Sequence, residues 1–110
     1  MRVLDAVRSE HERTVAQIAS LERSVALIVE ASELTSTDDE HDPEGATIAY
    51  ERAQAIALLR QARLDLDRLV NARMRLETGE PMTCESCGRE LDIERLVALP
   101  TTRTCIECAA

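Results

Sequence analysis

The fold is decided by two short stretches, Cys84-Glu85-Ser86-Cys87-Gly88 and Cys105-Ile106-Glu107-Cys108. They contain all four cysteines of the 110-residue chain, as two C-x-x-C pairs with seventeen residues between them. Two residues between the cysteines of a pair allow one tight turn to direct both sulfur atoms at the same ion. The sequence therefore predicts one structural Zn²⁺, with four protein ligands and no open position for water. The predicted ligands are Cys84, Cys87, Cys105 and Cys108.

The alternatives for these cysteines are an iron–sulfur cluster, a redox-active dithiol and plain buried thiols. The compact spacing favours zinc over a cluster. A redox pair normally occurs in a βαβ setting, which the rest of the chain does not suggest. Between the pairs, Leu91, Ile93, Leu96, Val97 and Leu99 are expected to form a miniature core, with a short helix over Ile93–Leu99.

The N-terminal part of the chain carries a heptad pattern. Its apolar positions alternate in steps of three and four, with no Gly or Pro before Pro43. The pattern predicts a helix from about residue 2 to about residue 34. The seam positions are Leu4, Val7, His11, Thr14, Ile18, Leu21, Val25 and Ile28.

A second helix is expected to start at Asp42-Pro43-Glu44 and to stop at Thr78-Gly79. Asp42 is a capping residue type and Pro43 suits the first helical position, whereas Gly79 followed by Pro81 ends a helix. Its seam positions, interrupted at Arg52 and Arg73, are Ile48, Ala55, Leu59, Ala62, Leu66, Leu69 and Leu76.

Two amphipathic helices joined by a short polar turn should fold back on each other. The composition agrees, with one Tyr, no Trp, no Phe and only three Gly. The predicted fold class is mainly α, namely a long antiparallel coiled-coil helical hairpin followed by a small C4 zinc finger. Residues 1–79 would form the hairpin, with a tip at about 35–45, and residues 80–110 the finger.

The net charge of −8 is concentrated at this tip. Residues 24–51 hold eight acidic residues and no Lys or Arg, whereas the acidic and basic residues balance on either side. Such a segment repels phosphate backbones and favours cationic or metal-rich partners. A solvated loop that caps two helices is the plainer alternative.

The finger resembles that of the DksA/TraR family. The resemblance is carried by C-x-x-C-G at Cys84–Gly88, by Arg95-Leu96-Val97-Ala98-Leu99-Pro100, which matches an R-L-x-A-x-P element, and by the closing C-x-x-C. It extends over nearly the whole chain, because the family places a helical hairpin before the finger. The family's aromatic-Gly before the first Cys is replaced here by Pro81-Met82-Thr83.

The resemblance implies a transcription regulator that binds RNA polymerase directly. Family members insert the hairpin tip through the secondary channel, towards the catalytic centre, without binding DNA. The family's tip pattern, Asp-x-x-Asp-x-Ala, corresponds to Asp39 and Asp42 here, with Glu44 in place of the Ala. An alternative alignment runs through Asp42-Pro43 and Ala46-Thr47, needs a one-residue deletion and puts Glu44 at the second acid. The candidate partner-binding residues are therefore Asp39, Asp42 and Glu44, supported by Asp38 and Glu40.

A rival interpretation is a zinc-stabilised acidic adaptor that binds another basic protein. DNA binding by the finger fits poorly with its lack of a basic stripe. We find no nucleophile–base pair and no phosphate-binding loop, so an enzyme is not expected. No stretch has the apolar length to span a membrane, and the expected protein is a cytoplasmic monomer.

Overall fold

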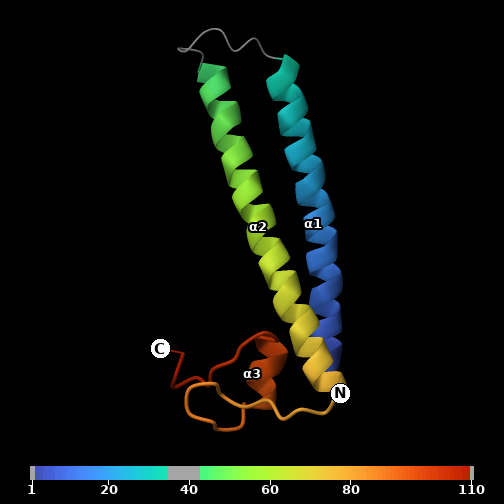
Figure 1. Ribbon diagram of the computed structural model, residues 1–110, viewed down its shortest axis with the longest axis vertical. Coiled ribbons are helices and arrows are strands. Elements are labelled where there is room, and N and C mark those ends of the chain that lie inside the picture. Colours follow the sequence, from blue (N-terminus) through green and yellow to red (C-terminus); the bar gives the residue numbers. More distant parts are fainter. Residues whose placement is uncertain (1, 35–42, 110) are drawn as a thin grey trace. The chain divides into compact units, whose positions relative to one another are not determined.

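The computed structural model describes residues 2–34 and 43–109. They form three helices, α1 (Arg2–Leu34), α2 (Pro43–Glu77) and α3 (Ile93–Ala98), which Figure 1 labels in chain order. The described ranges contain no strand, only an isolated antiparallel bridge between Thr83 and Glu90. The predicted mainly helical class, with a helical hairpin and a four-cysteine finger, is thus confirmed.

The helix ends follow the predicted signals. Pro43 opens α2, and Gly79 ends it with a φ of 77°. Gly79 N–H donates to the Leu76 carbonyl at 3.3 Å, and Glu80 N–H donates to the Arg75 carbonyl at 3.0 Å. These two bonds are the Schellman pattern, which satisfies the last carbonyls of a helix and needs a left-handed residue such as glycine. The expected cap at Asp42 lies outside the described residues.

The chain divides into two compact units, and each is described by itself. The terminal unit comprises Met1–Thr14 and Asp65–Ala110, and the central unit comprises Val15–Leu64. Within each unit, α1 and α2 pack antiparallel (Figure 1). The domain boundary expected at residue 79 stays a prediction.

The terminal unit has one hydrophobic core, which the helix ends share with the finger. Half-buried Leu76, Met82, Val97 and Cys108 pack against it. The predicted zinc ligands and the apolar side chains of the helices therefore pack into the same core. Its buried members are Val3, Val7, Leu69, Ala72, Cys84, Leu91, Leu96 and Cys105.

The central unit buries the predicted seam. On α2 the buried residues are Ala55, Leu59 and Ala62, and two of these three are alanine. On α1 the seam positions are half-buried, and they are Ile18, Leu21, Val25 and Ile28. Small side chains on one helix allow the backbones of the pair to approach closely, so branched side chains opposite them fill the seam.

Two details of the predicted seams differ from the structure. Val3 and Ala72 are buried although they lie outside the predicted positions. Arg73, placed on the seam, is half-buried and donates from Nε to Glu77 of its own helix at 2.9 Å. Among the described residues, no helix is apolar over a length that would cross a membrane.

Candidate metal centre

The first cysteine pair lies on a small antiparallel turn. Cys84 N–H donates to the Arg89 carbonyl at 2.8 Å, and Leu91 N–H donates to the Met82 carbonyl at 2.9 Å. Gly88 closes the turn with a φ of 76°, and its N–H donates to the Cys84 carbonyl at 2.8 Å. Any residue with a side chain would be strained in this left-handed conformation. The turn after Cys87 therefore requires glycine at position 88.

The second pair lies on a turn that is tied to the first. The N–H groups of Cys108 and Ala109 donate to the Cys105 carbonyl at 3.2 and 3.0 Å. Glu85 N–H, next to the first cysteine, donates to the Arg103 carbonyl at 2.8 Å. The Glu85 bond ties the first turn to the segment that leads into the second.

All four Sγ atoms lie within 4.8 Å of one another, and Cys87 Sγ is 3.8 Å from Cys105 Sγ. A tetrahedral zinc with Zn–S bonds of about 2.3 Å requires sulfur atoms about 3.8 Å apart. The four cysteines are therefore positioned to bind one metal ion. Cys84 and Cys105 are buried, Cys108 is half-buried and Cys87 is exposed, so one edge of the site faces solvent.

The surrounding backbone prepares the site for a cation. Hydrogen bonds from the backbone N–H groups of Cys105 and Cys87 lower the pKa of the Cys84 thiol to about 6. The backbone N–H of Cys108 likewise lowers the pKa of Cys105. Hydrogen bonds between the Cys108 thiol and the other sulfur atoms, first that of Cys105, favour its protonated form and raise its pKa to about 12. The thiolate of Cys84 is thus favoured at neutral pH before a metal arrives, and the metal displaces the protons that remain on the other thiols.

Helix α3 supports the second turn through Arg95. The Arg95 Nε donates to the Thr104 carbonyl at 2.9 Å, directly before Cys105. Thr102 Oγ1 donates to the same carbonyl at 3.2 Å. Arg95 is the first residue of the R-L-x-A-x-P element, and the motif alone gives it no role. A side chain that bonds a backbone carbonyl nine residues away cannot be identified from spacing alone.

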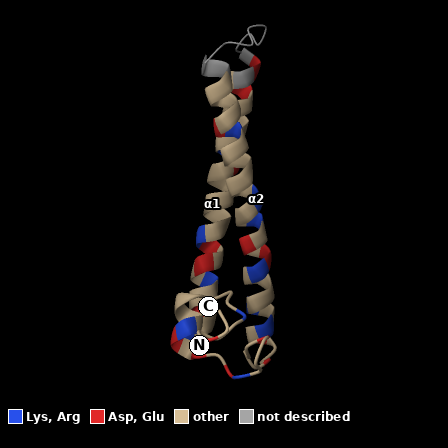
Figure 2. Ribbon diagram, turned by 90° about the vertical axis from the view of Figure 1, so that its left-hand side faces the viewer, with Lys and Arg blue, Asp and Glu red and all other residues tan. Residues whose placement is uncertain are grey.

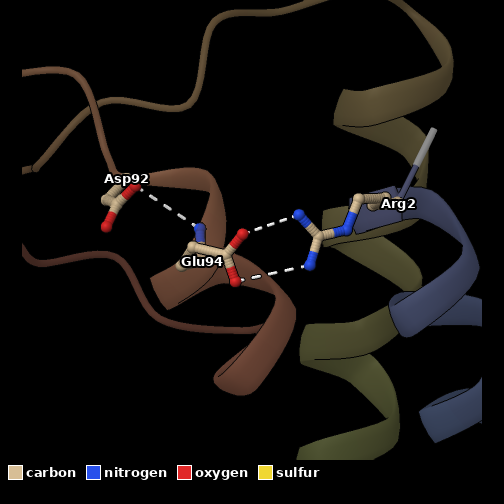
Figure 3. Close-up of polar contacts among 3 residues, drawn as sticks. All are labelled: Arg2, Asp92 and Glu94. Atoms are coloured by element: carbon tan, nitrogen blue, oxygen red, sulfur yellow. Dashed lines mark hydrogen bonds and ion pairs between the residues drawn. The ribbon is translucent and has the colours of Figure 1, made fainter.

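An ion pair connects α3 to the start of α1. Figure 3 shows both carboxylate oxygens of Glu94 directed at two guanidinium nitrogens of Arg2, at 2.6 and 3.3 Å. Arg2 holds the pKa of the Glu94 carboxyl below its usual value, first by the hydrogen bond and then by its charge. Asp92 caps α3 by accepting a bond from Glu94 N–H at 3.4 Å.

The predicted miniature core of the finger was partly wrong. Leu91 and Leu96 are buried and Val97 is half-buried, but Ile93 and Leu99 are 57% and 51% exposed. The short helix ends at Ala98, one residue before the predicted end. The reason is that α1 and α2 supply Val3, Val7 and Leu69 to this core, so the finger does not need to fill it alone.

The predicted tip residues Asp38, Asp39, Glu40 and Asp42 lie outside the described residues. Glu44 lies in the first turn of α2, and its side chain is not described. Between Ser24 and Glu51, the charged side chains that are described are exposed acids, Glu30, Glu33 and Glu51. Figure 2 shows this as red without blue on the helical turns that adjoin the grey segment.

Residues 77–110 match the family model of the prokaryotic dksA/traR C4-type zinc finger. This segment is a DksA/TraR zinc finger. The predicted resemblance of the finger to this family is thereby confirmed for residues 77–110, and the metal expected in this C4 finger is zinc. The predicted ligand residues are those that the structure brings together.

Two further matches cover more of the chain than the finger alone. An uncharacterized protein of Bacillus subtilis, YteA, is 39% identical over 72 residues, which cover 66% of this chain. The match spans only 30% of that relative's length. The structure of transcription factor DksA2 from Pseudomonas aeruginosa has a TM-score of 0.77 at 20% identity, over 97% of this chain and 77% of that one. At this identity the likeness shows the fold, and the fold is that of a DksA protein.

Proposed function

We propose that the protein is a transcription regulator that binds RNA polymerase and places its acidic tip in the secondary channel, near the active centre. The observation that supports this most strongly is the DksA/TraR zinc finger on a chain with a DksA fold. The function needs no catalytic residues and no sequence-specific DNA contact. We further propose that it acts as a monomer in the cytoplasm.

The distribution of charge supports the same function. The segment 24–51 carries acidic residues only, and Glu30, Glu33 and Glu51 are exposed. Closely spaced carboxylates can pair with Arg or Lys side chains, or change the environment of a bound Mg²⁺. We assign this contact to Asp39, Asp42 and Glu44, with Asp38 and Glu40 contributing charge.

A binding experiment with purified core RNA polymerase tests the proposal. The wild-type protein should bind, and a factor known to occupy the secondary channel should displace it. Asp39→Asn/Asp42→Asn should bind or regulate much more weakly while retaining its zinc and its helix content. The matched control is Glu12→Gln/Asp67→Asn, which removes the same charge from exposed positions of the terminal unit. Its binding should equal that of the wild type.

The alternative function is an acidic adaptor for another basic protein. The same acidic segment supports it, because charge alone does not select polymerase. Binding to polymerase without competition from a secondary-channel factor, or no binding at all, would favour the adaptor. If Asp39→Asn/Asp42→Asn regulates transcription like the wild type, the tip mechanism is wrong.

A further inference from the structure

One side of α2 carries exposed residues at heptad spacing. Tyr50, Ala53, Ala57, Arg60 and Leu64 follow one another in steps of three and four, so they lie on one face of the helix. All five are exposed, Tyr50 at 69% and Leu64 at 49%. They belong to the central unit, and we call them the outer face of α2.

The outer face lies opposite the residues that α2 buries in this unit. In a helix of about 3.6 residues per turn, its centre is about half a turn from that of Ala55, Leu59 and Ala62. The seam of the hairpin therefore leaves the outer face uncovered. Heptad spacing is how one helix presents side chains to another, and the small side chains of Ala53 and Ala57 let a second helix approach closely. The outer face is thus shaped to receive a helix.

One edge of the outer face is basic. Arg52 and Arg63 lie along this edge, each directly before a residue of the outer face, and Arg60 lies on the face itself. All three are exposed, and within the described parts of the chain none of them forms an ion pair. Residues 52–64 contain no Asp or Glu, so no acidic side chain lies along this edge.

The other edge is uncharged over most of its length. It carries Gln54, Leu58 and Gln61, with Glu51 and Asp65 at its two ends. Asp65 already takes part in an interaction within the chain. Residues 15–29 of α1 add one acid and one arginine, whose charges cancel. Three arginines and two acids thus leave residues 51–65 with a net charge of +1, and the positive groups lie on the face and its basic edge.

A second copy of the chain does not fit this face. Two antiparallel copies related by a two-fold axis would place like edges together, so the arginines of one copy would face those of the other. Two parallel copies would bring their acidic segments 24–51 side by side. Nucleic acid fits no better, because that acidic segment overlaps the outer face at Tyr50 and repels phosphate groups. The occupant that fits is a helix of another protein.

We propose that the outer face of α2 binds a helix of RNA polymerase that carries Asp or Glu along the side facing Arg52 and Arg63. The inference rests on the proposed function and adds a contact along the side of the hairpin. Tyr50 and Leu64 supply the apolar contacts and the arginines the charged ones. Tyr and Arg are enriched at protein interfaces, whereas Asp and Glu are depleted, which matches this segment. The tip changes the activity of the polymerase, and the outer face determines how tightly the protein is held.

The first test measures the affinity of the zinc-loaded full chain for purified core RNA polymerase. Tyr50→Ser/Leu64→Ser should weaken binding by about tenfold, since truncation of interface anchors commonly costs that much. Saturating protein should restore the full regulatory effect. Val15→Ser/Leu27→Ser is the matched control, because both residues are exposed hydrophobics of the same unit but lie on α1. It should bind like the wild type.

A second pair of variants tests the basic edge. Arg52→Gln/Arg63→Gln should weaken binding at low salt and reduce its salt dependence, because the lost contacts are between opposite charges. Arg8→Gln/Arg13→Gln removes the same charge from exposed arginines that already pair with Glu77 and Glu10. Its salt dependence should equal that of the wild type. Zinc stoichiometry and circular dichroism confirm that each variant is folded.

Cross-linking identifies the occupant. A photo-cross-linking amino acid in place of Ala57 should react with a helical, acidic segment of the polymerase. A cross-link only to a second copy or to nucleic acid, or equal affinity of Tyr50→Ser/Leu64→Ser and wild type, would overturn this inference alone. If the wild type does not bind polymerase, the proposed function and the inference both fail.

Discussion

Arg95 is the residue whose role the structure adds to the finger motif. Its Nε donates to the Thr104 carbonyl, which precedes the ligand position Cys105. Groups that orient metal ligands from behind commonly affect metal affinity by 10- to 100-fold, in order of magnitude. Arg95 is only half-buried, so its effect should lie at the lower end of that range.

We therefore expect Arg95→Ala to lower zinc affinity by about tenfold. Competition with a chromogenic chelator measures this directly. Arg103→Ala is the control, because Arg103 is exposed and supports the site through its backbone carbonyl, not its side chain. Equal zinc affinity of Arg95→Ala and Arg103→Ala would show that the Arg95 bond does not orient the ligand turn.

The cysteine pKa values give a second prediction at this scale. With the pKa of Cys84 lowered to about 6 and that of Cys105 also lowered, zinc binding at pH 7.5 should release fewer than four protons. Titration calorimetry in buffers of different ionisation enthalpy counts them. The apparent zinc affinity should fall more steeply with decreasing pH below about 6, because protons then also compete for the Cys84 thiolate. Release of all four protons at pH 7.5 would contradict the lowered pKa values.

The ends of α2 were predicted correctly because they depend on residues that are neighbours in the sequence. Pro43 and Gly79 set the ends of α2, since a proline start and a left-handed glycine stop depend on adjacent residues. Leu99 could not be placed correctly. Its exposure depends on Val3 and Val7, which occupy the core in its place and lie more than ninety residues away in the sequence.

Two adjacent residues of α2 test the assignment of the shared core. Leu69 is 2% exposed and Val70 is 40% exposed. Leu69→Ala should lower the free energy of unfolding by about 3 kcal/mol, because it removes buried methyl groups and leaves a cavity. Val70→Ala should change it by less than about 1 kcal/mol. Urea unfolding at fixed free zinc compares them, and similar losses for both variants would show that Leu69 is not a core residue.

At the scale of the whole molecule, the metal centre stabilises more than the finger. Cys84 and Cys105 belong to the same buried cluster as Val7 and Leu69. The sequence predicted a zinc finger directly after the second helix. It could not show that helix ends and metal ligands form one core, because that depends on how the finger packs.

Removal of zinc should therefore loosen the terminal unit first. Hydrogen exchange with and without a chelator should show faster exchange for helical amides in residues 3–14 and 65–76 than for those of the central unit. The seam of the central unit contains no metal ligand, so its amides should change less. A uniform increase along both helices, or a change confined to residues 84–108, would contradict the shared core.

The proposed function requires the acidic tip of this chain to reach the active centre of RNA polymerase. The most direct measurement replaces the catalytic Mg²⁺ of the polymerase with Fe²⁺, which generates hydroxyl radicals at that centre, and maps where the end-labelled protein is cut. The tip mechanism predicts cleavage within residues 35–44 that a secondary-channel competitor abolishes. A bound protein that is cut only elsewhere, or not at all, would contradict it.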